Sequence, residues 1–269
     1  MLRSFRKCRQ TRNSRWTLGL SLLLCGLGLL GTASAAPTAN PLAAQIVSPD
    51  LQLRRLAADV WMHTSWADHD GQRVPSNGLL VLRPEGLLLI DTSWDADSTA
   101  ELLVWAQQQF GRTVDLAVST HSHPDRVGGL AALDAAGIPA YASPRTLEQL
   151  AQRPAFRGLR ALPDSERLLE NQPVRFSGVE VVYPGVGHSD DNLAIWIEDH
   201  GILFGGCAVK SASATTLGNL ADADQSAWPH AIRALQARYG SAQIVVPGHG
   251  EPGSTELLKR TLELLGGSP

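Results

Sequence analysis

Apolar runs and amphipathic stretches alternate along most of this 269-residue chain, and their spacing predicts its secondary structure. Short runs of aliphatic and β-branched residues bounded by turn residues are typical of buried strands. Such runs lie at residues 51–56, 60–66, 78–82, 87–90, 114–120, 140–142, 174–183, 194–204 and 244–246. Pro84-Glu85-Gly86 predicts the turn of a hairpin between two of them, and the polar stretches 67–76 and 153–172 predict surface loops.

Helices are predicted where apolar side chains recur every three or four residues. They lie at residues 99–110, in a short stretch after Gly129, and at residues 146–152, 227–239 and 257–265. Ser98 and Glu101 predict a capping box for the first helix, and Gly111 predicts its end. Because strands precede helices in each half of the chain, the predicted fold class is α/β, with two similar halves packed sheet to sheet and helices on the outer faces.

The first 35 residues have the pattern of a secretory signal peptide. Six basic residues and no acidic ones begin the chain, an apolar stretch follows from about Trp16 to Leu30, and Ala33-Ser34-Ala35 offers a small-x-small cleavage site. The predicted organisation is therefore a signal peptide over residues 1–35 and one domain over residues 36–269. This arrangement predicts a periplasmic protein that has no membrane attachment after cleavage.

Two alternatives to cleavage remain: a retained membrane anchor, for which the apolar stretch is short, and a lipid on Cys25, for which the preceding Leu24 is bulky. Cleavage removes six basic and no acidic residues, so 17 basic residues remain against 26 acidic ones. A net charge near −9 argues against nucleic acid and anionic membranes as partners.

Cysteine usage points to a metal. Cys8 and Cys25 lie in the predicted signal peptide, which leaves Cys207 alone in the exported domain. A single cysteine excludes an internal disulfide, so its thiol is free, intermolecular or bound to a metal. An unprotected thiol is a liability in an oxidising compartment, and this favours the metal-bound state.

Two imidazoles and a carboxylate occur within five residues, His121-Ser122-His123-Pro124-Asp125, after the strand predicted at 114–120. Side chains at i, i+2 and i+4 of one short loop can converge on metal ions, and the preceding strand gives that loop a rigid support. Three further donors stand at predicted strand ends beside glycines, which let the backbone turn sharply. These donors are His188, Cys207 and His249.

The six donors predict two three-ligand sites. One set has three imidazoles, from His121, His123 and His188, and the other is mixed, with Asp125, Cys207 and His249. Imidazole and thiolate donors select zinc over magnesium or calcium, and three protein ligands per ion leave a position for water, as in catalytic sites. Two zinc ions about 3.5–4 Å apart can share one hydroxide and polarise the bond that it attacks.

The string His121-x-His123-x-Asp125-x-x-Gly128-Gly129 resembles the signature of the metallo-β-lactamase superfamily. The set of Asp125, Cys207 and His249 is similar to the class B, di-zinc subclass with a cysteine ligand. The resemblance covers essentially all of the chain after residue 35 and is closest to the Verona-type, integron-borne enzymes. It is carried by 74–78, 88–92, 188–192, 205–207 and 218–224. It implies an αβ/βα four-layer sandwich of two mixed sheets, with the metals at one end.

The resemblance also implies roles for residues around the metals. Asp125 and Asn219 match catalytic positions, with Asn219 helping zinc to hold the lactam carbonyl oxygen, and Lys210 matches the partner of the substrate carboxylate. Asp91 and Arg126 match positions that orient the ligands or balance their charge.

A mobile flap over the cleft is expected to supply further substrate contacts. Its matching residues are Trp66, His69 and Arg73. Three other histidines lie in a predicted strand, turn and helix and are expected to be structural. They are His63, His200 and His230.

The sequence therefore predicts an enzyme, a monomeric zinc-dependent β-lactamase. A metal-bound hydroxide is expected to hydrolyse the amide bond of penicillins, cephalosporins and carbapenems, which confers antibiotic resistance. Two alternatives stand beside it. One is another hydrolase of the same fold, of the thioester or glyoxalase type, which resembles a pattern with histidine where this chain has Arg126. The other is a periplasmic zinc-binding protein without a catalytic role.

Overall fold

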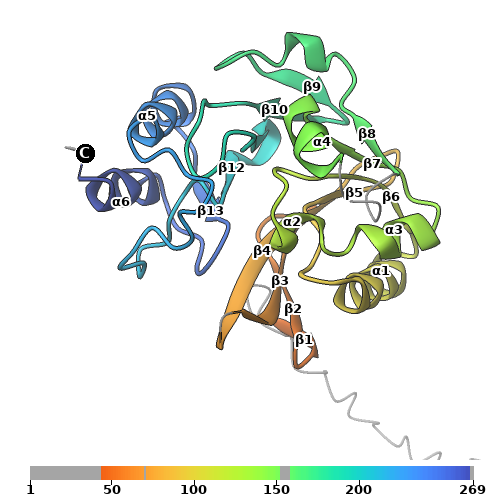
Figure 1. Ribbon diagram of the computed structural model, residues 1–269. Coiled ribbons are helices and arrows are strands. Elements are labelled where there is room, and N and C mark those ends of the chain that lie inside the picture. Colours follow the sequence, from red (N-terminus) through yellow and green to blue (C-terminus); the bar gives the residue numbers. More distant parts are fainter. Residues whose placement is uncertain (1–43, 70, 152–157, 267–269) are drawn as a thin grey trace, which may run out of the picture. The chain divides into compact units, whose positions relative to one another are not determined.

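Two mixed β-sheets, each covered by helices on one face, form the part of the chain that the structure describes (Figure 1). The structure is a computed structural model that describes residues 44–69, 71–151 and 158–266. The predicted signal peptide lies outside these residues. Among the described helices, none has the length and apolar character needed to cross a membrane.

The larger sheet contains eight strands in chain order within the described residues. The first five strands pair with one another in antiparallel fashion, and the fifth to the eighth strands pair in parallel. The strands are β1 (Gln45–Ser48), β2 (Leu51–Arg55), β3 (Val60–His69), β4 (Gln72–Leu82), β5 (Leu87–Ile90), β6 (Val114–Val118), β7 (Ala140–Ala142) and β8 (Leu159–Ala161).

The smaller sheet has the order β13-β12-β11-β10-β9 and is antiparallel except for the parallel pair of β12 and β13. Its strands are β9 (Val174–Phe176), β10 (Val179–Val182), β11 (Ala194–Ile197), β12 (Ile202–Gly206) and β13 (Ile244–Pro247). Two groups of helices accompany the sheets, α1 (Ala96–Phe110), α2 (Pro124–Val127), α3 (Leu130–Ala135) and α4 (Pro144–Leu150) in the first half, α5 (Trp228–Tyr239) and α6 (Glu256–Leu264) in the second.

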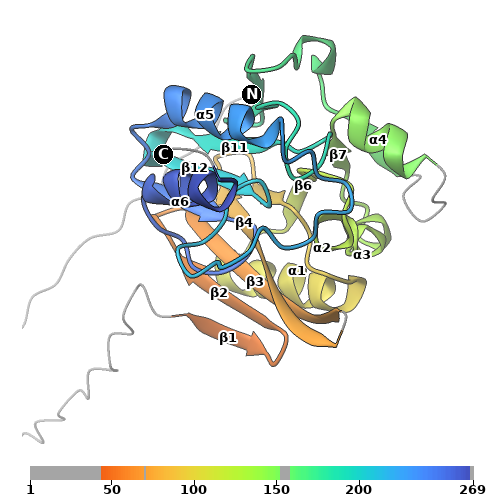
Figure 2. The same ribbon diagram turned by 60° about the vertical axis from the view of Figure 1, so that its left-hand side comes forward.

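Alternation along the strands divides the core into layers, as β5 shows. Leu88 and Ile90 face the second sheet, where they join a cluster with residues of β10, β11 and β12. Leu87 and Leu89 face the other way and pack with apolar residues of α1, α3 and α4. A third cluster lies between the second sheet and helices α5 and α6, centred on the fully buried Trp228. Figure 2 shows α5 and α6 over the second sheet. The predicted four-layer sandwich is confirmed.

The polar loop predicted at 67–76 is wrong. Strands β3 and β4 pair without interruption from Val60 opposite Val81 to His69 opposite Gln72, so these residues form the far end of a long hairpin. Side chains near its tip are exposed. Solvent on the tip therefore explains the polar composition, which the sequence analysis took as a sign of irregular backbone.

The helix predicted at 99–110 begins three residues earlier, at Ala96. Its N-cap is Asp95, whose carboxylate accepts the Ser98 backbone N–H at 2.8 Å, so the predicted capping box is wrong. An aspartate is a strong N-cap because its charge also faces the positive end of the helix dipole. The predicted end is confirmed, since Gly111 adopts the left-handed conformation with φ 64°.

Candidate active site

The predicted metal ligands gather where strands of both sheets end. His121 lies three residues after β6, Cys207 directly after β12, and His249 two residues after β13. His188 lies in the loop that joins β10 to β11, and that loop is bound to the β6 end by the Leu193 N–H, which donates to the Thr120 carbonyl at 2.9 Å. The hydrogen-bonded strands thus bring together residues that lie far apart in the sequence.

Three imidazoles form one part of this cluster. The ring centroids of His121, His123 and His188 are 4.7–5.2 Å apart, and His123 Nδ1 lies 3.1 Å from His188 Nε2. Burial lowers the pKa of His121 and of His188 well below the ordinary value, which keeps both rings neutral. His121 Nε2 is buried without a hydrogen-bond partner among the described residues. Neutral rings with uncommitted nitrogens are the state that binds a metal.

The mixed set lies beside the imidazoles. Cys207 Sγ is 3.5 Å from Asp125 Oδ2 and 3.3 Å from His249 Nε2. His249 Nε2 is 3.3 Å from Asp125 Oδ2. Each of these three residues offers one donor atom within 4.8 Å of the others. Two further groups meet the same limit and combine residues of both predicted sets. They are His121 with His188 and Cys207, and His121 with His123 and Asp125. The donor atoms and their spacing fit zinc.

Two histidines are oriented by groups that the sequence analysis missed. His123 Nε2 is 2.9 Å from the Asp222 carboxylate, and His249 Nδ1 donates to the Pro75 carbonyl at 2.5 Å. In each ring the other nitrogen points to the cluster. Asn77 fixes the turn that contains His249 through bonds from its amide to the Pro247 and Gly250 carbonyls, at 3.0 and 2.7 Å. These contacts join segments far apart in sequence, so spacing alone carries no signal for them.

Arg126 lies fully buried beneath the mixed set. Its guanidinium is 2.8 Å from Asp125 Oδ2, 2.9 Å from Cys207 Sγ and 3.3 Å from Asp91 Oδ2. Burial by itself raises the pKa of Asp125. The guanidinium and His249 lower this pKa by more than burial raises it, so it lies well below its ordinary value. Gly248 has no room for a side chain, because a Cβ there would lie 2.6 Å from Cys207 Sγ.

Asp91 ties Arg126 to the strand end that precedes the histidine loop. Its two carboxylate oxygens accept the Thr120 N–H at 2.7 Å and the Thr120 hydroxyl at 2.8 Å. Burial raises the pKa of Asp91 to about 6 even though Arg126 and Thr120 lower it. The structure thus places both predicted supporting residues, Asp91 and Arg126, directly under the ligands.

His63 lies under this layer and yields a prediction about pH. Its Nε2 is 3.2 Å from the Asp91 carbonyl, and burial lowers its pKa from 6.5 to about 4. Between these values the folded state binds fewer protons than the unfolded state, so stability is lost as the pH falls from 6.5 towards 4. The free energy of unfolding can be measured in urea on chelator-treated protein at pH 7 and at pH 4.5. Its decrease from pH 7 to pH 4.5 should be about 2 kcal/mol larger for the native chain than for His63→Gln. Equal losses in both proteins would contradict this account.

The predicted substrate residues differ in position. Lys210 Nζ is buried 2.9 Å from the Cys207 carbonyl and 5.0 Å from the Trp228 ring centroid, beside the ligand cluster. Burial lowers its pKa, while Cys207 raises it. Asn219 is exposed in the 218–224 loop, where its side-chain oxygen accepts the Ala221 N–H at 3.0 Å.

The hairpin residues contact one another and residues of neighbouring turns. Arg73 lies 2.5 Å from the Asp50 carboxylate, and its guanidinium stands 5.9 Å from the Trp66 ring centroid. The His69 ring packs against Trp94, with centroids 5.7 Å apart. No described contact joins Trp66 or Arg73 to the six predicted ligands. Their contact with substrate stays a prediction.

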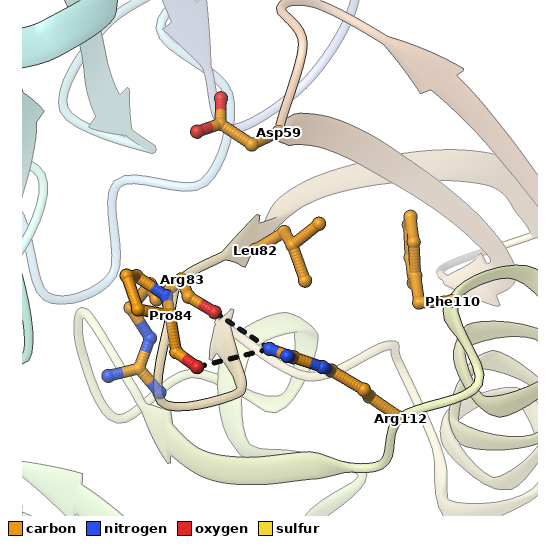
Figure 3. Close-up of a pocket in the computed structure, with 6 residues that line it drawn as sticks. All are labelled: Asp59, Leu82, Arg83, Pro84, Phe110 and Arg112. Carbon is orange, nitrogen blue, oxygen red and sulfur yellow. Dashed lines mark hydrogen bonds between the residues drawn. The ribbon is translucent and has the colours of Figure 1, made fainter.

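A separate cavity of about 480 Å³ lies near the start of β6, at the end of this strand away from the predicted ligands. Figure 3 shows the residues that line it. Its lining includes the turn between β4 and β5 and Arg112 just before β6, whereas His121, His123 and Asp125 follow the other end of β6. Arg112 lines this cavity and donates to the Arg83 and Pro84 carbonyls at 3.1 and 3.2 Å. The cavity is thus no part of the ligand cluster.

Comparison with known proteins agrees with this fold and site. Residues 71–249 match the metallo-beta-lactamase superfamily. The chain is 36% identical over 260 residues to the metallo-beta-lactamase type 2 of Bacillus cereus, covering 94% of this chain and 99% of that one.

Two solved structures are similar. A metallo-beta-lactamase from Pontibacter korlensis has a TM-score of 0.73 and 39% identity, covering 80% of this chain and 99% of that chain. FIM-1 from Pseudomonas aeruginosa, in a mono-zinc form, has a TM-score of 0.75 and 32% identity, covering 82% and 98%.

A four-layer sandwich with histidine, aspartate and cysteine donors at one end of its sheets defines a metal-dependent hydrolase. The chain belongs to the metallo-β-lactamase superfamily. The predictions of this family, of its fold and of a zinc-dependent enzyme of this type are confirmed. The finer resemblance to the Verona-type enzymes stays a prediction.

Proposed function

We propose that this chain hydrolyses the amide bond of penicillins, cephalosporins and carbapenems with two zinc ions, and so confers antibiotic resistance. The convergence of six donors carries the proposal: Asp125, Cys207 and His249 each offer a donor atom within 4.8 Å of the others, and the three imidazole rings beside them have centroids 4.7–5.2 Å apart. The basic start, apolar stretch and small-x-small site of residues 1–35 support a periplasmic location, where such antibiotics meet their targets. We propose that the enzyme acts as a monomer.

Zinc bound by these sets would lower the pKa of a water molecule and so supply a hydroxide nucleophile at neutral pH. The chain's own residues hold that centre in place. Arg126 keeps Asp125 ionised and contacts Cys207 Sγ, while Asp222 and Pro75 fix the rings of His123 and His249. Such supporting contacts set ligand geometry and basicity.

Lys210 would bind the carboxylate of the substrate. Its ammonium is held beside the mixed set by the Cys207 carbonyl, the one acceptor found for it among the described residues, and N–H groups are left for an anion. Asn219 would donate its amide N–H to the lactam carbonyl oxygen, since its own oxygen is already engaged by the Ala221 N–H. Substrate is thus held at two points about the reacting amide.

Hydrolysis of nitrocefin, a chromogenic cephalosporin, tests this function directly. The purified protein should turn nitrocefin over, lose that activity in EDTA and recover it when zinc is restored. Zinc-bound protein that cleaves thioesters but no lactam would favour the other hydrolase, against which the presence of Arg126 after Asp125 argues. Bound zinc with no turnover of lactam, ester or thioester would favour a zinc-binding protein.

Replacement of Lys210 should separate binding from chemistry. Lys210→Met keeps an apolar stem against Trp228 but removes the charge, so KM for penicillin and cephalosporin substrates should rise about 10-fold with a smaller change in kcat. Steady-state kinetics with zinc content measured in parallel checks this. Lys259→Met, at a partly exposed position on α6, is the matched control. An unchanged KM for the Lys210 variant would remove this residue from the site.

A further inference from the structure

The two loops that supply the three imidazoles are fastened together at Ser122. Ser122 lies between His121 and His123 and is 5% exposed. Its backbone N–H donates to Asp191 Oδ2 at 2.9 Å. Asp191 is fully buried and lies three residues after His188, so this one hydrogen bond joins the His121–His123 loop to the His188 loop.

A second link runs over the surface through α4. The Ser122 hydroxyl donates to the side-chain oxygen of Gln149, and the Gln149 amide donates to the Asp190 carboxylate. Gln149 and Asp190 are exposed, so this link is weaker than the buried one. Both links nevertheless connect the same two loops, at adjacent residues.

The His188 loop is also braced from within. Asn192 Oδ1 accepts the Ser189 N–H at 3.2 Å, and Asn192 Nδ2 donates to the Gly185 carbonyl at 2.9 Å. The loop therefore has a defined shape of its own. The Leu193 N–H bond to the Thr120 carbonyl holds one end of this loop at the end of β6, and the bond from Ser122 to Asp191 fixes the loop directly between His121 and His123.

We infer that Asp191 is a positioning residue for the three-imidazole metal set, acting through the backbone of Ser122, with Gln149 as an auxiliary link. The inference rests on the proposed function only in that a metal occupies this set. A buried carboxylate forms a charge-assisted hydrogen bond, about twice as strong as a neutral one. Removing it frees a backbone N–H that stands between two ligands, so His121 and His123 can shift relative to His188. Supporting contacts of this kind change metal affinity about 10–100-fold.

Stepwise metal binding to the full chain tests this inference without recourse to turnover. Apoprotein of the native chain and of Asp191→Ala would be titrated with Co²⁺, and with Zn²⁺ against a chelator. The thiolate-to-cobalt charge-transfer band arises from Cys207 and reports the mixed set. The d–d bands arise from cobalt in both sets, so the part of their intensity that does not follow the charge-transfer band reports the imidazoles. We expect Asp191→Ala to weaken the imidazole set about 10–100-fold and to leave the thiolate band at its native concentration dependence.

Two further variants keep the test decisive if Asp191→Ala does not fold. Asp191→Asn retains an oxygen that can accept the Ser122 N–H, so its loss of affinity should be smaller than that of the alanine variant. Gln149→Ala should weaken the imidazole set by a few-fold at most, and Glu148→Gln on the same exposed helix is its matched control. Native affinity in Asp191→Ala, or equal weakening of both sets in the Asn variant, would overturn the inference. Failure of the native chain to cleave nitrocefin would instead refute the proposed function, because the metal titration does not depend on it.

Discussion

Replacing Cys207 with serine should leave the protein with one tightly bound zinc ion and reduce turnover of nitrocefin by about 100-fold or more. Loss of a mere supporting contact costs about 10–100-fold, and removal of a ligand should exceed it. Cysteine sulfur is a strong zinc ligand, and the Arg126 guanidinium lies 2.9 Å from Sγ, whereas a serine hydroxyl is a poor zinc ligand. The mixed set would then retain only Asp125 and His249.

Zinc content per chain and steady-state kinetics with added zinc measure this effect. Cys207→Asp is an informative companion, because its carboxylate is an anionic ligand and should restore part of the affinity that serine loses. Ser211→Ala is a matched control in the same loop, buried but outside both ligand sets. Two tightly bound zinc ions and native turnover in Cys207→Ser would show that the thiolate is not a ligand.

The gathering of the candidate ligands was predictable because its signals are local. A buried strand that ends in a histidine loop, or in a glycine followed by a donor, has a composition that strand propensity and turn chemistry both explain. This holds for His121 after β6 and for Cys207 after β12. The layers were predictable for the same reason, since alternation along strands and the stripe around Trp228 record burial directly.

What sequence could not predict was set by contacts between distant segments. Asp222 and Asp191 stand in polar loops that resemble other polar loops, and only the fold brings them to His123 and Ser122. The tip of the β3–β4 hairpin failed for a different reason. Exposed strand and exposed loop have the same polar composition, so the pairing of His69 with Gln72 left no pattern to detect.

Substitution of Arg126 should have the largest effect on stability. Arg126→Met keeps much of the volume but leaves the carboxylates of Asp125 and Asp91 and the Cys207 sulfur buried without the cation that all three contact. It also removes the bond to the Gly248 carbonyl, 3.0 Å from the guanidinium. Breaking a buried ion pair by removing one partner costs about 3–5 kcal/mol, because it leaves an uncompensated buried charge. Urea unfolding of the chelator-treated protein at pH 7 should show a loss of this size in the free energy of unfolding. The control is Arg83→Met, which removes a buried arginine paired with Asp115 away from the ligands and should leave the zinc content of untreated protein unchanged.

The same variant should also change how the stability of the fold depends on pH. In the native chain the pKa of Asp125 lies well below its ordinary value, so its contribution to stability is present above about pH 4 and is lost as the pH falls further. Without the guanidinium, the pKa of Asp91 rises further and burial is less opposed at Asp125, so the folded state binds more protons between pH 4.5 and pH 7 and stability falls as the pH rises across this range. Chelator-treated Arg126→Met should therefore be closer to the native chain in stability at pH 4.5 than at pH 7. A deficit that is the same at both pH values would mean that Arg126 acts through packing rather than through charge.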